Sequence, residues 1–312
     1  MNLKSWFRHK KTPEEGNGLS ASLEELTGMR RLTRYVRNFS HKKAFSDQAG
    51  NIKSAFKGRG MEFEEIRAYN FGDDARDIDW RVTARKQKPY TKLFAEERDL
   101  QVYVWLDLSA SMLFGTKKEL KSVTASKLAA LIGWLSLEKK DRFGAIIFDG
   151  AKTWWFKPQN SRAQLLAVLK KIAELGAAAL QKPQADETEL AKSLKLLEQN
   201  AGNRATVFVI SDFNRNFERL KPELGALARR HRLYLAEVYD ALEEKAPKAG
   251  EYLAQYDGKR LIFDTGSKEY RRNYENYFAE KRREWAEFCR QNGCVRIQIR
   301  TDADLRRDLK FL

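Results

Sequence analysis

Residues 101–111 read QVYVWLDLSAS, an apolar strand that runs directly into Asp107, Ser109 and Ser111. This spacing places one carboxylate and two hydroxyls at the end of a strand. A hard divalent cation such as Mg²⁺ prefers oxygen ligands, keeps several waters and is commonly held by only one or two protein carboxylates. The D-x-S-x-S spacing therefore predicts ligands for Mg²⁺, with Mn²⁺ as the alternative ion. A solvated turn is the simpler interpretation, because Asp and Ser both favour turns.

From Gln101 onward, strand-like apolar runs alternate with helix-like stretches, which is typical of a doubly wound α/β fold with a mostly parallel sheet and flanking helices. The first strands are almost continuously apolar, which indicates burial on both faces of the sheet. The last one alternates Val295, Ile297 and Ile299 with polar residues, as a charged edge strand does. We predict strands at residues 101–106, 142–148, 205–211, 232–239 and 294–299.

Two aromatic features add to this pattern. In KTWWF, Trp154 and Trp155 are adjacent, and adjacent residues of a strand face opposite sides. We predict a hairpin with one indole buried and the other on the surface, and a partner contact is the alternative. A long helix with an aromatic face, from Tyr270 to Phe288, is predicted to end near Gly293.

The N-terminal third has a different character. Residues 1–18 are predicted to be a flexible basic tail, because HKKTPEEGNG at residues 9–18 is polar, carries Pro and Gly and has no periodicity. Between residues 22 and 39, apolar residues recur at intervals of three and four residues, which predicts an amphipathic helix. The stretch MEFEEIRAY, which begins at Met61, resembles a strand. We divide the chain into the tail (1–18), the N-terminal helix with a short β segment (19–98) and the α/β domain (99–312).

The chain has 312 residues and a net charge of +16. Half of this excess lies in residues 1–60, which hold 13 Lys or Arg against 5 acids, and such an arm can contact nucleic acid, anionic lipid or an acidic protein face. No recognised nucleic-acid motif is present, and the short stretch around Trp6 and Phe7 could make only weak peripheral membrane contact. The sequence lacks a run that could span a membrane and a secretory h-region, so we expect a cytoplasmic location.

The D-x-S-x-S element resembles the metal-ion-dependent adhesion site (MIDAS) of von Willebrand factor A-type domains. In that site a Thr and a second Asp, from two later loops, join the first Asp and the two Ser. Thr188 in DETEL and Asp212 in ISDF are the candidates here, and each lies where a strand feeds a helix. The resemblance implies the metal ligands Asp107, Ser109, Ser111, Thr188 and Asp212.

Local alternatives stay open for the two later residues. Asp186 can cap the start of a helix with Glu189 three residues on, which would leave Thr188 as an ordinary residue of the first turn. Asp212 can simply begin the turn after its strand.

The stretch from Gly58 to Leu100 contains G-x-G-x-E-F, G-D-D-x-R-x-I-D-W and A-R in this order, just ahead of the strand at residue 101. It closely resembles a bacterial family known as domain of unknown function fifty-eight, whose members look like von Willebrand A-type proteins preceded by a signature segment. The likeness continues through ISDF and DALEEKAPKAGEY and covers nearly everything after Leu19. The signature residues would be Asp73, Asp74, Arg76, Asp79, Trp80 and Arg85.

This resemblance implies a protein whose gene neighbours one for a MoxR-type AAA+ ATPase. It would act as an adaptor or chaperone component that binds this ATPase and, as a further expectation, other von Willebrand A-type proteins. No enzymatic activity is implied. One departure matters, because the family commonly places glycines before the Thr, where this chain has Asp186 and Glu187.

The signature segment also has a physical interpretation. Its aspartates and arginines can form a charged lattice, with Ile78 and Trp80 anchoring it to the core, because buried charges must be paired. Such a lattice would lock the segment onto the A-type domain. Recognition of a partner is the alternative role.

We therefore expect a non-enzymatic, Mg²⁺-dependent protein-binding module whose cation accepts a carboxylate from a partner. A metal-dependent hydrolase acting on phosphate esters is one alternative. Against it, Ser109 stands where an aspartyl-phosphate site has a second Asp, and no Walker A, G-x-S-x-G or H-E-x-x-H motif occurs. A nucleic-acid-binding protein that uses its basic N-terminal arm is the other alternative.

Overall fold

The computed structural model describes residues 17–36, 61–70, 73–96, 100–182, 185–202, 204–214, 217–256 and 259–305. The chain forms two compact units: a larger one of residues 1–40 and 100–312, and a smaller one of residues 41–99. Residues 17–36, which the sequence grouped with the signature segment, pack within the larger unit because their apolar side chains join its core.

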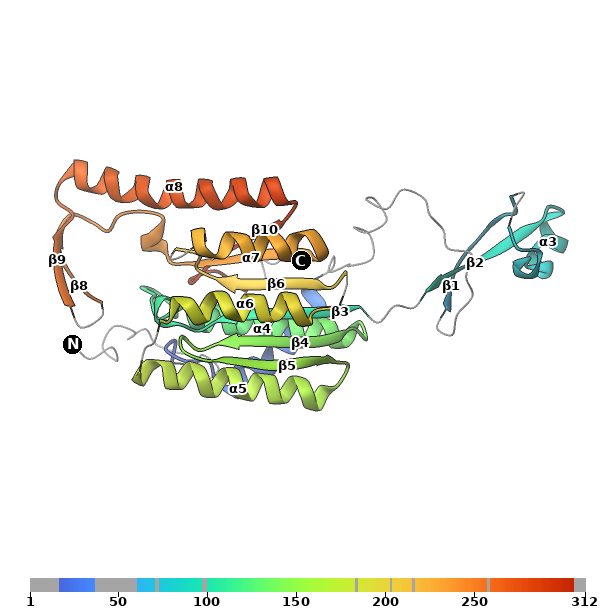
Figure 1. Cartoon of the computed structure of the whole chain (residues 1–312), viewed down its shortest axis with the longest axis horizontal. Helices are drawn as coiled ribbons and strands as arrows, with labels where there is room; N and C mark the ends of the chain where they lie inside the picture. The colour runs from blue at the N-terminus through green and yellow to red at the C-terminus, as the bar shows by residue number, and fades with distance from the viewer. Residues whose placement is uncertain are drawn as a thin grey trace. The chain divides into compact units, whose positions relative to one another are not determined.

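The larger unit is built around a six-stranded sheet (Figure 1). Its strands are β3 (Gln101–Asp107), β4 (Arg142–Phe148), β5 (Thr153–Gln159), β6 (Thr206–Ser211), β7 (Arg232–Tyr239) and β10 (Val295–Arg300). They lie in the order β10-β7-β6-β3-β4-β5, and each neighbouring pair is parallel except β4 with β5. Counted along the chain, this is the doubly wound strand order 3-2-1-4-5-6. The predicted α/β fold with a mostly parallel sheet is confirmed.

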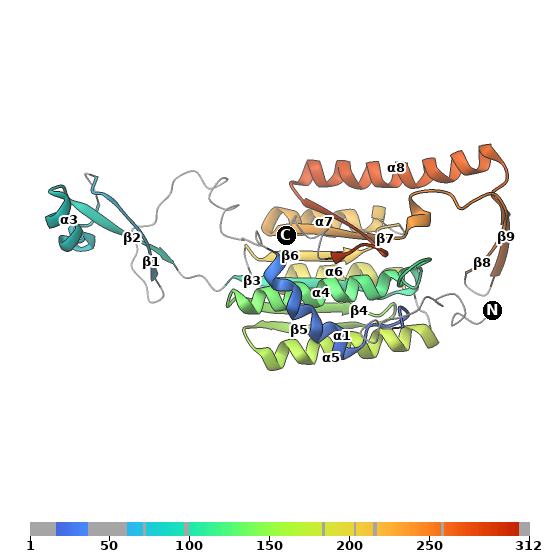
Figure 2. The ribbon, with the colours of Figure 1, turned by 180° about the vertical axis from the view of Figure 1, so that it is seen from behind.

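Helices cover both faces of the sheet, as Figures 1 and 2 show. α4 (Lys121–Glu138) and α5 (Arg162–Gln181) pack on one face, and α6 (Glu187–Asn200), α7 (Phe217–Arg230) and α8 (Lys268–Asn292) pack on the other. Along β3, Val102 and Val104 pack in the hydrophobic core under α4 and α5. Tyr103 and Trp105 pack in the core on the opposite face, under α6, α7 and α8. Within the described ranges, no helix has the length and apolar character needed to cross a membrane.

The N-terminal helix is shorter and tighter than its sequence pattern predicts. α1 (Leu23–Gly28) begins with a capping box between Ser22 and Glu25. At Met29 the chain tightens into the 3₁₀ helix η2 (Met29–Tyr35), whereas the apolar spacing predicts one helix over residues 22–39. The Trp134 indole of α4 donates to the Leu26 carbonyl over 3.1 Å, which fixes α1 on the larger unit. Residues 1–16 of the predicted tail, and 37–39, lie outside the described residues.

A hairpin lies between β7 and α8, after the short 3₁₀ helix η5 (Ala241–Glu243). Its strands β8 (Glu251–Tyr256) and β9 (Lys259–Asp264) are antiparallel, and the sequence pattern did not predict them. α8 ends where Gly293 adopts a φ of 64°, as predicted. Beyond it, β10 is an edge strand in which exposed Arg296 and Gln298 alternate with buried Ile297 and Ile299, which confirms its predicted character.

β4 and β5 form the hairpin predicted for KTWWF. Both indoles are half-buried, so the prediction of one buried and one exposed indole is wrong. Trp154 donates to Asp149 over 3.0 Å and lies against the Lys171 ammonium, whereas Trp155 stacks on Tyr103. Packing on both sides of the sheet accounts for this adjacent pair.

The smaller unit is a hairpin with a short helix. β1 (Met61–Ala68) pairs antiparallel with β2 (Tyr90–Glu96), and η3 (Ala75–Asp77) and α3 (Trp80–Lys86) lie between them in the chain. Asp79 connects the two parts: its carboxylate accepts the N–H groups of Arg81 and Val82 at the start of α3, and its own N–H donates to Tyr90 of β2.

Candidate functional site

Two of the predicted ligands lie at the carboxyl edge of the sheet, on neighbouring strands. Asp107 is the last residue of β3, and Asp212 directly follows β6. β3 and β6 are adjacent and parallel, and the strand order reverses between them: β4 and β5 continue to one side, β7 and β10 to the other. Open α/β sheets bind ligands outside the strand ends at such a reversal.

Asp107 is buried, with an exposed fraction of 3%, and each of its oxygens already accepts a hydrogen bond. Oδ1 accepts the Ser109 N–H over 2.9 Å, and Oδ2 accepts the Ser211 hydroxyl over 2.7 Å. Burial, and after it the charge of Asp212, raise the pKa of Asp107 to about 6. Because the charge of Asp212 acts on Asp107, the two carboxylates repel each other when both are ionised, and a cation between them would relieve that repulsion.

The two serines stand in the turn that follows Asp107. Ser109 precedes the 3₁₀ helix η4 (Ala110–Met112), which contains Ser111. Their hydroxyl oxygens are 3.4 Å apart. Ser109 is buried and Ser111 is partly exposed, so the motif is not a solvated turn. It brings a carboxylate and two hydroxyls together at the strand end.

Asp212 is held by a buried lysine, Lys121, at the start of α4. The Lys121 ammonium donates to Asp212 Oδ2 over 2.7 Å and to Glu243 Oε1 over 2.8 Å. The Asn214 side-chain amide donates to the same Glu243 oxygen over 2.7 Å. Burial by itself would lower the pKa of Lys121, but the charges of Asp212 and Glu243 outweigh burial and hold this pKa above its ordinary value. The lysine is therefore charged at any physiological pH.

Asp240, which follows β7, joins the neighbouring loops of this edge. It is fully buried. Its carboxylate accepts the Thr116 N–H over 2.9 Å, the Thr116 hydroxyl over 2.6 Å and the Thr301 hydroxyl over 2.7 Å. Thr116 lies in the loop after the two serines and Thr301 directly follows β10, so one carboxylate holds three strand ends in place.

Thr188 is placed differently from the other four predicted ligands. Asp186 caps α6 by accepting the N–H groups of Thr188 and Glu189, which is the capping alternative drawn from the sequence. The Asp186 N–H donates to the Gly150 carbonyl after β4, so α6 begins at the same edge of the sheet. Thr188 is exposed, and within the described residues no hydrogen bond joins its hydroxyl to the other candidates. Its role as a metal ligand stays a prediction.

The gathered side chains suit a hard cation. Asp107, Ser109, Ser111 and Asp212 offer only oxygens, and two carboxylates are the number that Mg²⁺ commonly takes from a protein. Across the part of the chain that the structure describes, no group of three or more His, Cys, Asp or Glu side chains is arranged to hold a metal. A cation here would thus need hydroxyls as well as carboxylates, which the D-x-S-x-S turn supplies.

The aspartates of the signature segment organise the smaller unit. Asp73 pairs with Arg67 over 2.7 Å and accepts the Asn70 N–H over 2.9 Å. Asp74 caps η3 by accepting the Arg76 N–H, in the same way that Asp79 caps α3. These contacts hold the loop between β1 and β2 through one ion pair and several backbone N–H groups.

Trp80 lies on the surface of the smaller unit, and its predicted role as an anchor onto the core of the A-type domain stays a prediction. Its exposed fraction is 70%. The reason is local: none of the residues of α3 is buried, so this short helix offers no apolar layer for the indole. Ile78 is half-buried and forms a bridge to Thr91 of β2, while Arg85 is exposed.

Lys121 and Glu243, which hold Asp212 in place, are among the residues of this edge that the sequence analysis missed. A signal for Lys121 existed, because α4 is buried on nearly all sides, and a charged side chain in such a helix must find a partner inside the protein. Glu243 lies in DALEEK, a stretch that the sequence analysis used only for the family resemblance.

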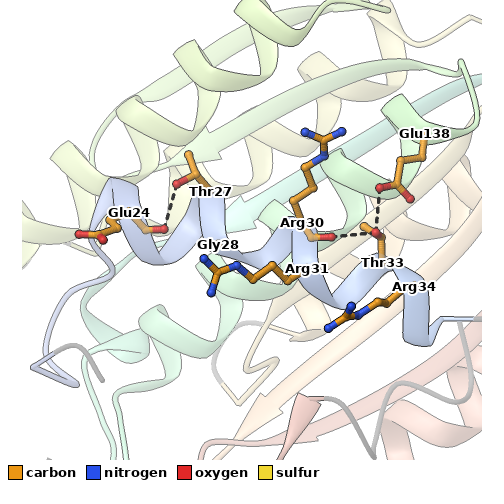
Figure 3. Close-up of a pocket in the computed structure, with 8 residues that line it drawn as sticks. All are labelled: Glu24, Thr27, Gly28, Arg30, Arg31, Thr33, Arg34 and Glu138. Carbon is orange, nitrogen blue, oxygen red and sulfur yellow. Dashed lines mark hydrogen bonds between the residues drawn. The ribbon is translucent and has the colours of Figure 1, made fainter. Parts of the chain in front are cut away.

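A separate groove of about 750 Å³ runs along α1 and η2 (Figure 3). Figure 3 shows the Arg30 side chain pointing away from those of Arg31 and Arg34, so the three guanidinium groups do not converge. The Thr33 hydroxyl contacts Glu138 over 2.8 Å at the wall of the groove. None of the lining residues belongs to the candidate cation site; they are Glu24, Thr27, Gly28, Arg30, Arg31, Thr33, Arg34 and Glu138.

Fold and site together define a doubly wound α/β domain with an oxygen-rich edge at its strand-order reversal, carrying a small signature unit ahead of its first sheet strand. The chain belongs to the family described as "Protein of unknown function DUF58", whose model matches residues 65–284. Uncharacterized proteins of Mycobacterium tuberculosis and Mycobacterium bovis are each 30% identical over 261 residues, covering 83% of this chain and 81% of the relative. The predicted family resemblance is confirmed.

Two solved structures are also similar to this chain. The conserved hypothetical protein BatB from Bacteroides thetaiotaomicron has a TM-score of 0.38 and 15% identity, covering 68% of this chain and 95% of that one. The SpRpn10 VWA domain has a TM-score of 0.36 and 10% identity, covering 68% of this chain and 94% of that one.

Proposed function

We propose that this protein is a non-enzymatic binding module that holds Mg²⁺, or alternatively Mn²⁺, at the carboxyl edge of its sheet and uses it to bind a partner protein. Asp107, Ser109 and Ser111 would hold the cation together with Asp212, and Thr188 is the further candidate. A bound Mg²⁺ would supply an open coordination position for a carboxylate of the partner.

The observation that carries this proposal is the meeting of two buried carboxylates and two hydroxyls where the strand order reverses. Asp107 and Asp212 come from adjacent strands, and the Ser211 hydroxyl bonds directly to Asp107. Burial keeps water from screening the two like charges, which favours a cation at this place. The partly exposed Ser111 leaves one side of the cluster open to a partner.

An acidic loop of a MoxR-type AAA+ ATPase is the partner that we propose, and other von Willebrand A-type proteins are further candidates. The chain carries a net charge of +16, and a basic surface speeds encounter with an acidic partner. The cation would select a carboxylate within that acidic loop, while the basic surface would set the rate of association.

Isothermal titration of chelator-treated protein with MgCl₂ tests the cation. The wild type is expected to bind Mg²⁺, and Asp107→Asn is expected to weaken binding by at least about tenfold. Substituting even the residues that only support metal ligands lowers metal affinity by about this factor. Asp141→Asn is the matched control: Asp141 is also buried but precedes β4, at the opposite edge of the sheet. Equal uptake by wild type and Asp107→Asn would refute the site.

Affinity capture from native cells tests the partner in the same variants. We expect the wild type to retain an AAA+ ATPase in Mg²⁺ and to release it in chelator, and Asp107→Asn to retain little in either condition. Capture of the ATPase that is indifferent to both chelator and substitution would contradict a cation-mediated contact.

A further inference from the structure

The Lys121 ammonium is the one cation that the described structure places inside the candidate site. Lys121 is 2% exposed and stands at the first position of α4. Its nitrogen lies 2.7 Å from Asp212 Oδ2 and 2.8 Å from Glu243 Oε1. A buried ammonium loses its hydration, so it is retained only where carboxylates replace the lost water.

The carboxylate that holds Lys121 is the same one that the cation site would use. Asp212 Oδ2 is engaged by the ammonium, and among the described residues Oδ1 accepts only the Asn214 N–H, at a long 3.3 Å. Asp212 thus has one oxygen committed to a cation and one nearly free. Any divalent ion that draws on Asp212 must share this carboxylate with the lysine.

The charges at this edge do not balance with the lysine alone. Asp107, Asp212 and Glu243 bring three carboxylates, and Lys121 brings one ammonium. The Asp240 carboxylate and the Arg282 guanidinium, which both belong to residues bonded to Glu243, add one charge of each sign and leave the excess unchanged. Asn214 satisfies Glu243 with a neutral amide, and Ser211 satisfies Asp107 with a neutral hydroxyl. Negative charge is therefore left over around Asp107 and Asp212, where it attracts a second cation, while the nearby ammonium repels that cation.

We infer that Lys121 is a built-in competitor for the divalent cation: it holds Asp212, sets the affinity of the site and keeps it weak until a partner adds a carboxylate. This inference rests on the proposed cation-binding function. Its consequence is specific in sign, since removing the ammonium strengthens divalent-cation binding, whereas removal of a merely supporting residue weakens it.

Titration of chelator-treated full-length protein with MgCl₂, and in parallel with MnCl₂ followed by electron paramagnetic resonance, measures the competition. Lys121→Met is expected to tighten binding by at least about tenfold, because it removes a positive charge next to the site. Glu243→Gln is expected to act in the opposite direction: with its second carboxylate gone, the ammonium turns fully to Asp212, and binding weakens.

The matched control is Lys127→Met. Lys127 lies on the same helix, is largely buried and also pairs with two carboxylates, those of Glu119 and Glu25. Its removal is expected to leave divalent-cation affinity unchanged. Should Lys121→Met fail to fold, Lys121→Gln tests the same competition, because it can still donate a hydrogen bond to Asp212 without its charge.

The outcomes separate the inference from the function on which it rests. Tighter binding by Lys121→Met with unchanged Lys127→Met supports the competition. Wild-type binding with equal or weaker binding by Lys121→Met overturns the inference and leaves the proposed function standing. Binding by Lys121→Met alone supports the inference and overturns the proposed function of the wild type. No binding by any variant overturns both.

Discussion

At the scale of single residues, His231 shows how burial without a partner acts on a titrating group. Its exposed fraction is 5%, and neither ring nitrogen has a hydrogen-bond partner among the residues that the structure describes. Burial, and after it the charge of Arg230, lower the pKa of His231 to about 4. The imidazole is therefore neutral in the folded protein at pH 7.

This pKa predicts a loss of stability in mild acid. The unfolded chain binds a proton near the ordinary histidine pKa of about 6.5, whereas the folded chain binds it only near 4. The contribution of His231 to the free energy of unfolding is therefore fully present above pH 6.5. It is lost progressively as pH falls toward 4, which lowers the free energy of unfolding by up to about 3 kcal/mol. Urea unfolding of wild type and His231→Leu between pH 7 and pH 4.5 measures it.

His231→Leu is expected to have the flatter pH profile, so that the two proteins diverge below pH 6.5. Other acidic groups titrate identically in both proteins and cancel in the difference. Parallel profiles over the whole range would show that His231 has the same pKa in the folded and unfolded chain and would contradict the lowered pKa.

Some residues of the candidate site could be predicted from the sequence, and others could not. Asp107 and Ser109 belong to one short motif at a strand end, and Asp212 ends the neighbouring strand, so their approach follows from strand order alone. Lys121 is different, because its partners Asp212 and Glu243 lie 91 and 122 residues away along the chain. No local pattern encodes a contact of that range.

At the scale of helices and strands, replacing two different glycines by alanine is expected to change the free energy of unfolding in opposite directions. In α4, a Cβ on Gly133 would meet Leu165 Cδ1 at 2.5 Å and Phe143 at 3.2 Å, so this glycine lets α5 and β4 approach α4 closely. In α5, a Cβ on Gly176 would meet nothing within 4 Å. Packing favours glycine at position 133, because a Cβ there would displace buried side chains, whereas Gly176 only weakens its helix.

Gly133→Ala is expected to lower the free energy of unfolding by about 1 to 3 kcal/mol through overpacking. Gly176→Ala is expected to raise it by about 0.5 to 1 kcal/mol, the difference in helix propensity. Chemical denaturation of both variants beside the wild type measures these changes, and the pair serve as each other's control. Equal effects of the two substitutions would show that packing around α4 does not discriminate between them.

The central strands β3, β4, β6 and β7 of the main sheet were predictable because each is apolar and buried on both faces. The hairpin of β8 and β9 lies outside that sheet, so it lacks this signal. The Asp-Gly pair at residues 257–258 is a sequence signal for such a hairpin that the pattern analysis did not use. η2 was misread because apolar positions three and four apart fit a 3₁₀ helix as well as an α-helix over so short a stretch.

At the scale of the whole molecule, the smaller unit is an insertion in the larger one. Among the described residues, both hydrophobic cores of the larger unit draw only on segments outside residues 41–99. Replacing residues 41–99 with a Gly-Ser linker is therefore expected to leave one cooperative thermal transition, with a midpoint within about 5 °C of that of the full chain.

Deletion of residues 17–36 is the contrasting variant, because it removes Leu26 and Met29 from the core. Circular dichroism during heating is expected to show a clearly lower midpoint for this protein. A linker variant that unfolds as early as this one, or without cooperativity, would show that the larger unit depends on residues 41–99.

The docking of α1 on α4 has a consequence for synthesis on the ribosome. α1 is six residues long, too short to persist as an isolated helix in water, and Trp134, which fixes it, is translated about a hundred residues later. Newly made α1 therefore lacks its packing partner while the whole inserted unit is made. The inserted unit can form its hairpin first. We expect α1 to dock on α4 only late in synthesis, after Trp134 has been translated.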